Sequence, residues 1–287
     1  MSDRAETSTR TRGFTGPGPY GWVLLTFGVL LLVRWLGAYN VYFLEEDEIS
    51  LAAGIAALVR DNVGELYRYT PQLGYHRFVE WATLLLGGDI ALVPRLMKLW
   101  SVIVGALVPA LGLLMFRNLL SRPERWLLVL VLAINPILWR SSQYGNSAMA
   151  SLGFVVVALT LLSNPGGPWR RALGLGAFGL AVFVRADAVV MAPLFAYLLY
   201  RELGSWRTAL GWLGGLAAIG SRAGAVVLAT DPRLDGAASA LANHMMNAEW
   251  TTQFWEYLLW AMSPLPLVFA VLGLRALAAD RHVLFWT

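Results

Sequence analysis

Cysteine is missing altogether from this chain of 287 residues, and histidine occurs only three times. Without cysteine there is no disulfide framework, no thiolate metal site and no cysteine nucleophile. His76, His244 and His282 lie far apart and have no neighbouring His or Cys, so no zinc motif is visible. A glycine-rich phosphate loop, a Ser-His-Asp set and a strand-rich catalytic domain are also not visible.

Charged residues are scarce as well. They make up 14% of the chain and hydrophobic residues 57%, whereas soluble domains have about 25% and roughly 45–50%. The apolar residues form long runs, and a bilayer core requires helices of about 20 such residues. The thirteen tryptophans also suit membrane interfaces. We therefore predict an all-α, polytopic bundle of transmembrane helices surrounded by membrane lipids.

The apolar runs predict about eight spans. They are Tyr20–Tyr39, Ile90–Phe116, Arg125–Trp139, Ala148–Leu162, Ala172–Val184, Ala188–Tyr200, Thr208–Ala229 and Leu258–Leu277. Several are shorter than a full crossing, and two pairs are candidates for one broken helix each. Residues 1–19 are polar and predict a disordered cytoplasmic tail rather than a cleavable signal peptide, which leaves residues 20–287 as the transmembrane domain. Since Phe285-Trp286-Thr287 resembles the start of another apolar run, we expect the sequence to be truncated.

The arginines predict which side of the membrane each loop occupies. If the chain alternates, five groups of arginines fall on one side: Arg4, Arg10 and Arg12; Arg117, Arg122 and Arg125; Arg170 and Arg171; Arg201 and Arg207; Arg275 and Arg281. By the positive-inside bias this side is cytoplasmic. The predicted protein is therefore a multi-pass plasma-membrane protein with its amino terminus inside. The same bias explains the net charge of +4 without a nucleic-acid partner.

Two long polar segments, about 40–89 and 230–257, then lie outside. The first carries four consecutive carboxylates, Glu45 to Glu48, and continues into Ile49–Arg60, whose apolar residues recur at helical spacing. This pattern predicts a helix along the membrane surface. Repulsion and the low dielectric there favour the neutral form of some carboxylates, and such a group can take a proton from a hydroxyl. Acidic residues are equally typical of a helix N-terminus or a solvated turn.

The order aromatic–Leu–acidic–Asp–Glu after the first span, with an Ala-rich interfacial helix behind it, resembles the first external loop of GT-C-type glycosyltransferases. These polytopic cell-envelope enzymes take sugars from polyprenyl-phosphate donors, and they include protein O-mannosyltransferases and lipid A aminoarabinose transferases. Their acidic motif aligns with Asp47-Glu48. Their Pro-Pro-Leu-like segment aligns with Tyr69-Thr70-Pro71-Gln72-Leu73, where one Pro is lost, followed by Tyr75-His76-Arg77-Phe78 and Gly87-Gly88.

Further similarities extend over about Tyr20 to Ala229. They are Val93-Pro94-Arg95-Leu96, Ile134-Asn135-Pro136, Ser141–Ser147, and Phe183-Val184-Arg185-Ala186-Asp187 with Pro193. The resemblance implies catalytic carboxylates at Asp47, Glu48 and Glu46. It also implies an acceptor site in the loops, for which Tyr69, Gln72, Tyr75 and Gln143 are candidates.

A lipid-linked donor also needs cations near the outer face, because guanidinium groups bind phosphate well. The candidates are Arg77, Arg95, Arg185, His76 and Lys98, with Arg34 and Arg140 near the same side. Each could instead extend its charged group to the interface, and Arg185 could pair with Asp187. We expect no cofactor and no metal: carboxylates can hold a divalent cation, but four successive residues cannot all converge on one ion. Gly174, Gly176 and Gly179 are expected to be close-packing positions.

The predicted function is therefore transfer of a sugar from a polyprenyl-phosphate donor to a lipid, glycan or protein hydroxyl, with inversion, on the extracytoplasmic face. Asp47 is the expected general base, and Glu48 or Glu46 orients it or the acceptor. A transporter or flippase is the main alternative, although it should carry charges and broken helices near mid-membrane. A non-catalytic subunit of a membrane assembly is the other alternative.

Overall fold

The computed structural model describes residues 18–39, 46–60, 73–115, 117, 120–164 and 166–230. The chain divides into two units, Met1–Gly224 and Ala225–Thr287, and of the second only the end of one helix is described. The predicted tail, most of the second external segment and the predicted span Leu258–Leu277 lie outside the described residues.

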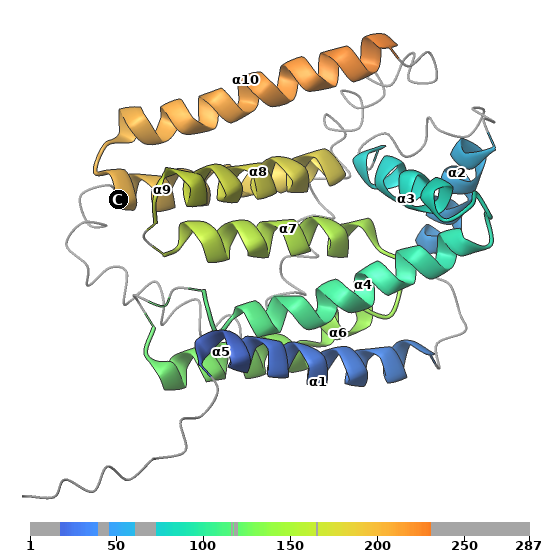
Figure 1. Ribbon diagram of the computed structural model, residues 1–287, viewed down its shortest axis with the longest axis horizontal. Coiled ribbons are helices and arrows are strands. Elements are labelled where there is room, and N and C mark those ends of the chain that lie inside the picture. The colour runs from blue at the N-terminus through green and yellow to red at the C-terminus, as the bar shows by residue number, and fades with distance from the viewer. Residues whose placement is uncertain are drawn as a thin grey trace, which may run out of the picture. The chain divides into compact units, whose positions relative to one another are not determined.

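Every regular element in the described part of the chain is a helix, which confirms the all-α class (Figure 1). The α-helices are α1 Pro19–Tyr39, α2 Glu46–Val59, α3 Leu73–Leu85, α4 Leu92–Leu111, α5 Arg122–Ile134, α6 Pro136–Ser141, α7 Ser147–Leu162, α8 Pro168–Val184, α9 Ala192–Leu203 and α10 Trp206–Thr230, and η2 Ala186–Met191 is a 3₁₀ helix. By length and composition alone, two of them could cross a membrane, α1 over Pro19–Ala38 and α4 over Leu92–Leu111. The bundle of about eight spans stays a prediction.

The predicted span Arg125–Trp139 is not one helix. α5 ends at Ile134 and α6 begins at Pro136, because proline has no N–H to donate and disfavours helical conformation in the residue before it. The side chain of Asn135 accepts a hydrogen bond of 2.9 Å from the backbone N–H of Leu138. The new helix is therefore capped where the old one ends.

Arg34 of α1 binds this break between α5 and α6. Its side chain is 1% exposed and donates to the carbonyl oxygens of Ala133 (3.3 Å) and Leu138 (3.1 Å) and to Ser142 Oγ (2.5 Å). The guanidinium also lies 5.1 Å from the centre of the Trp139 ring. Arg34 thus joins α1 to α5 and α6 by hydrogen bonds, and its charged group does not extend to the membrane interface.

The predicted span Ala188–Tyr200 also begins differently. Its first residues belong to η2, and α9 starts only at Ala192. Pro193 lies in the first turn of α9, a position where the missing N–H costs no helical hydrogen bond. The apolar run was correct in extent, but it contains two helical segments.

Helices α7 and α8 run antiparallel and pack along their length, and α4 lies against α1 and α7 (Figure 1). Two glycines of α8 lie at close helix contacts. A Cβ at Gly174 would lie 2.6 Å from Leu162 Cγ of α7, and one at Gly179 would lie 3.0 Å from Leu216 Cδ1 of α10. Both are close-packing positions, as predicted. A Cβ at Gly176 would meet no atom of the described residues within 4 Å, so for this residue the prediction was wrong.

The bundle has two ends, which are formed by different helix termini. At one end, which we call the α3 end, α2 and α3 pack on the last turns of α8 and the first turns of α4 and α7. At the other, which we call the Asn164 end, the last turns of α4 and α7 meet the first turns of α5 and α8. All but one of the candidate site residues in the described part of the chain belong to the α3 end, and Gln143 lies in the turn that precedes α7.

Candidate functional site

The α3 end has its own apolar core. It joins residues from five helices that are distant in sequence: Leu51 and Ile55 of α2, Tyr75 and Val79 of α3, Val93 and Met97 of α4, Ala150 of α7 and Val184 of α8. Phe78 and Trp100 add a ring contact with centroids 4.8 Å apart. The two short helices are therefore fixed to the ends of the longer ones by buried apolar surface.

The acidic motif begins α2. The helix starts at Glu46, so Asp47 and Glu48 lie inside its first turn and do not precede it; the side chains of these three residues are outside the described part of the chain. The helix buries Leu51 and packs it in the apolar core, whereas Ile49 is 53% exposed. The predicted helix is therefore present and is three residues longer at its start. Of the predicted apolar stripe, Ala52 packs against this core and Ile49 does not, while Leu51 and Ile55 are the buried residues.

Helix α3 meets the end of α8 at Gly74. A Cβ at this position would lie 1.8 Å from the carbonyl oxygen of Phe183, which is backbone and cannot rotate away. The absence of a side chain thus allows the segment Tyr75-His76-Arg77 to approach the residues that lead to Arg185. These residues are more than 100 positions apart, and no local pattern predicts the contact.

Gly74→Ala is expected to lower the free energy of unfolding by about 3 kcal/mol, because the added carbon forces α3 and α8 apart. Gly176→Ala is the matched control. It lies inside α8 with open space around it, so it should be neutral or stabilising by up to about 1 kcal/mol through helix propensity. Denaturant unfolding in detergent, followed by tryptophan fluorescence, measures both. Equal stability of the two variants would contradict the contact.

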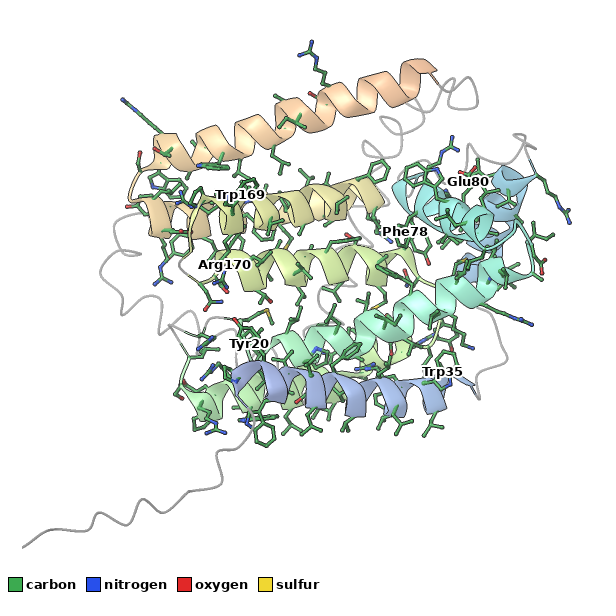
Figure 2. The ribbon with its side chains drawn as sticks, in the orientation of Figure 1. Tyr20, Trp35, Phe78, Glu80, Trp169 and Arg170 are labelled. Carbon is green, nitrogen blue, oxygen red and sulfur yellow. The ribbon has the colours of Figure 1, made fainter. Side chains whose placement is uncertain are left out.

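Arg77 and Glu80 form a buried ion pair on α3. Arg77 Nη1 lies 2.8 Å from Glu80 Oε2, and the two residues are 6% and 4% exposed; Figure 2 labels Glu80 beside Phe78. Glu80 was not among the predicted site residues, although its spacing of three from Arg77 is one at which helical side chains meet. A phosphate that binds Arg77 must share the guanidinium with Glu80.

His76 is fully buried on the same helix. Burial, and secondarily the charge of Arg77, lowers the pKa of the imidazole to about 4. The side chain is therefore neutral at pH 7. If it contacts a donor phosphate, it does so as a neutral hydrogen-bonding group and not as a cation.

The folded-state pKa of about 4 for His76 predicts a pH dependence of stability. Because the unfolded imidazole has a pKa near 6.5, the unfolded state binds more protons between the two values. The free energy of unfolding is therefore unaffected by protonation of His76 above pH 6.5. It falls by about 3 kcal/mol as the pH is lowered from 6.5 to 4. His76→Leu removes this component, so its unfolding free energy should fall less over that interval. Parallel curves for wild type and variant would contradict the assignment.

Arg185 caps the end of α8. Its Nη1 donates to Ser147 Oγ at 3.3 Å, and Ser147 is buried at the start of α7. The side chain of Asp187 lies outside the described part of the chain, so the alternative pairing of Arg185 with Asp187 stays a prediction. Sequence reasoning did not identify Ser147, because a serine at a helix start is also an ordinary capping residue.

The remaining candidates divide between surface and core. Arg95 is exposed and Lys98 half-buried, both in the first two turns of α4. Gln143 is half-buried in the turn before α7, where the N–H of Asn146 donates to Ser101 Oγ of α4 at 3.1 Å. Tyr75 is fully buried. Tyr69 and Gln72 lie outside the described residues.

The structure thus places Tyr75, His76 and Arg77 on α3, which packs against the end of α8, where Arg185 is the C-cap residue. Arg95 and Lys98 lie in the first two turns of α4. No group of three or more His, Asp or Glu side chains that could hold a metal occurs in the described ranges, and the acidic motif's side chains are not among them. Comparison with protein-family models, with curated proteins and with solved structures found no match for this chain.

Proposed function

We propose that this protein is a membrane glycosyltransferase that moves a sugar from a polyprenyl-phosphate donor to an acceptor hydroxyl on the extracytoplasmic face. The observation that carries the proposal is the α3 end itself. There the helix that begins with Glu46, Asp47 and Glu48 shares one apolar core with the helix that bears Arg77 and with the end of α8 before Arg185. A general base and phosphate-binding cations are the two sets of groups that the reaction needs.

The distribution of arginine supports the orientation of this site. Seven arginines that were predicted to be cytoplasmic belong to the described residues, and they lie at helix ends remote from α3. They are Arg117 after α4, Arg122 and Arg125 in α5, Arg170 and Arg171 in α8, Arg201 in α9 and Arg207 in α10. By the positive-inside bias the α3 end then faces outward. Nucleotide sugars are made in the cytoplasm, so a transferase with its site on the outer face requires a lipid-linked donor.

In the proposed reaction the acceptor oxygen attacks the anomeric carbon from the face opposite the phosphate, which inverts the configuration. The bond from the acceptor oxygen to this carbon forms as the bond from the carbon to the phosphate oxygen breaks. Asp47 takes the hydroxyl proton, and Glu48 or Glu46 orients Asp47 or the acceptor. Polyprenyl phosphate leaves with both electrons of the broken bond and needs no proton, only cations such as Arg77, Arg95 or Arg185 to stabilise its charge.

A transporter is the strongest alternative, because a helix broken at Asn135 and a buried arginine in α1 are features of transporter sites. In this chain, however, the two features are bound to each other. Arg34 donates to the carbonyl oxygens of Ala133 and Leu138 beside the break. The groups that would bind a solute are already used in packing α1, which favours the transferase.

The test is release of free polyprenyl phosphate from a panel of polyprenyl-phosphate sugars by membranes that contain this protein. Release with one sugar, above the level of membranes without the protein, is the expected result. The panel is repeated with lipid, glycan and protein acceptors, since water alone is a poor substitute for a specific hydroxyl. Transport of a labelled lipid-linked sugar without any release would overturn the proposal in favour of the alternative.

A further inference from the structure

A pocket lies at the Asn164 end, remote from the α3 end. It has a volume of about 600 Å³ and is open to the outside. Its lining consists of Tyr20, Leu114, Arg117, Thr160, Leu161, Asn164 and Arg170. Figure 2 labels Tyr20 and Arg170. The proposed sugar transfer makes no use of this pocket.

Asn164 builds the pocket by joining the ends of two helices. Its side chain is 7% exposed, and its Nδ2 donates to the carbonyl oxygens of Leu114 (2.8 Å) and Thr160 (2.9 Å). Its Oδ1 accepts from the backbone N–H of Arg117 at 3.1 Å. The amide therefore fixes the backbone that positions the Arg117 side chain, which is itself exposed.

Arg170 provides the second guanidinium. Its Nε donates to the carbonyl oxygen of Leu161 at 2.9 Å and its Nη2 to that of Thr160 at 3.2 Å, so the side chain is held in place before any ligand arrives. Arg170 also belongs to the first turn of α8, where the helix dipole adds partial positive charge.

The charge of the pocket is not balanced by its own lining, which contains no carboxylate. The two described carboxylates at this end have other partners: Glu124 accepts from the backbone N–H of Ser121 at 2.6 Å, and Glu202 lies 3.3 Å from Arg171. A concave site with two guanidinium groups and no carboxylate suits an anion that has several acceptor oxygens.

We infer that this pocket binds a phosphate group. Two sources share this chemistry: the headgroup of an anionic phospholipid in the cytoplasmic leaflet, which is the leaflet predicted for this end, and a small phosphate ester in solution. Basic pockets between helices at the cytoplasmic side of a membrane are suited to anionic headgroups. The Tyr20 hydroxyl, at the start of α1, adds a neutral donor or acceptor at the edge of the pocket.

The experiment measures binding of fluorescently labelled phosphatidylglycerol to the full chain in detergent micelles. Arg117→Gln is expected to weaken binding about tenfold, the effect of losing one charge-assisted hydrogen bond. Because Arg117 is exposed, the substitution should leave the fold intact. Arg122→Gln is the matched control, since it removes a nearby exposed arginine that does not line the pocket.

Inorganic phosphate at millimolar concentration distinguishes the two sources. If it displaces the labelled lipid from wild type, the pocket takes soluble phosphates; if it does not, the pocket takes the lipid headgroup, and either result supports the inference. If Arg117→Gln and Arg122→Gln weaken lipid binding equally, the effect comes from general surface charge, and the inference of a phosphate-binding pocket is overturned. The same conclusion would follow if phosphatidylglycerol and inorganic phosphate both fail to bind.

Discussion

Asp47→Asn combined with Glu48→Gln is expected to slow the release of polyprenyl phosphate by a factor of about 100 to 10,000, the usual contribution of a general base. Both changes keep the size and hydrogen-bonding shape of the side chain but remove its capacity to take a proton. Since they lie in the first turn of α2, the loss of negative charge costs the helix only about 0.3–1 kcal/mol. Activity should therefore fall far more than stability.

Asp89→Asn provides the matched control for this double variant. Asp89 is a carboxylate of the same predicted external loop, and its Oδ1 accepts from the backbone N–H of Ala91 at 2.9 Å, a bond that asparagine can also make. Release should be unchanged in this variant. If the Asp47, Glu48 variant releases polyprenyl phosphate as fast as wild type, the catalytic role of the motif is wrong. If Asp89→Asn slows release equally, the effect belongs to the loop's charge and not to a general base.

Several helices in the described part of the chain were predictable from the sequence. α1, α7 and α10 begin and end within two residues of the apolar runs, because a long apolar run bounded by polar residues or glycine leaves few alternative helix limits. The break at Asn135-Pro136 was visible as a proline, but Arg125–Trp139 was predicted as one span. Whether a proline ends a helix or interrupts it depends on partners for the carbonyls that the break frees, and here the Ala133 carbonyl has Arg34 of another helix as its partner.

The site was predictable in its residue types but not in its contacts. Charged and aromatic residues after the first span predicted the segment that holds the site. The approach of Gly74 to Phe183, in contrast, depends on how α3 packs on α8. The same holds for Asn164, which reads as a loop residue after α7 and in fact closes the end of α4 through Leu114. Packing between distant segments decides both, and periodicity along one segment carries no information about it.

Glu80→Ala is expected to lower the free energy of unfolding by about 3–5 kcal/mol, the usual cost of removing one member of a buried ion pair. The substitution takes away the carboxylate 2.8 Å from Arg77 Nη1 in a place that water reaches poorly. Replacement of both residues, Arg77→Met with Glu80→Met, should recover most of this loss, because apolar side chains of similar volume often replace a buried pair without net cost. Chemical unfolding of the three proteins in detergent measures the difference.

The double replacement also decides what Arg77 does. If the pair serves only to pack α3, the stable Arg77→Met, Glu80→Met protein should release polyprenyl phosphate with an unchanged KM for the donor. If Arg77 binds the donor phosphate, the same protein should fold normally but show a KM raised about tenfold or more, the loss expected for one charge-assisted contact. Arg95→Met, which changes an exposed arginine on α4, then shows whether the phosphate depends on one cation or on several.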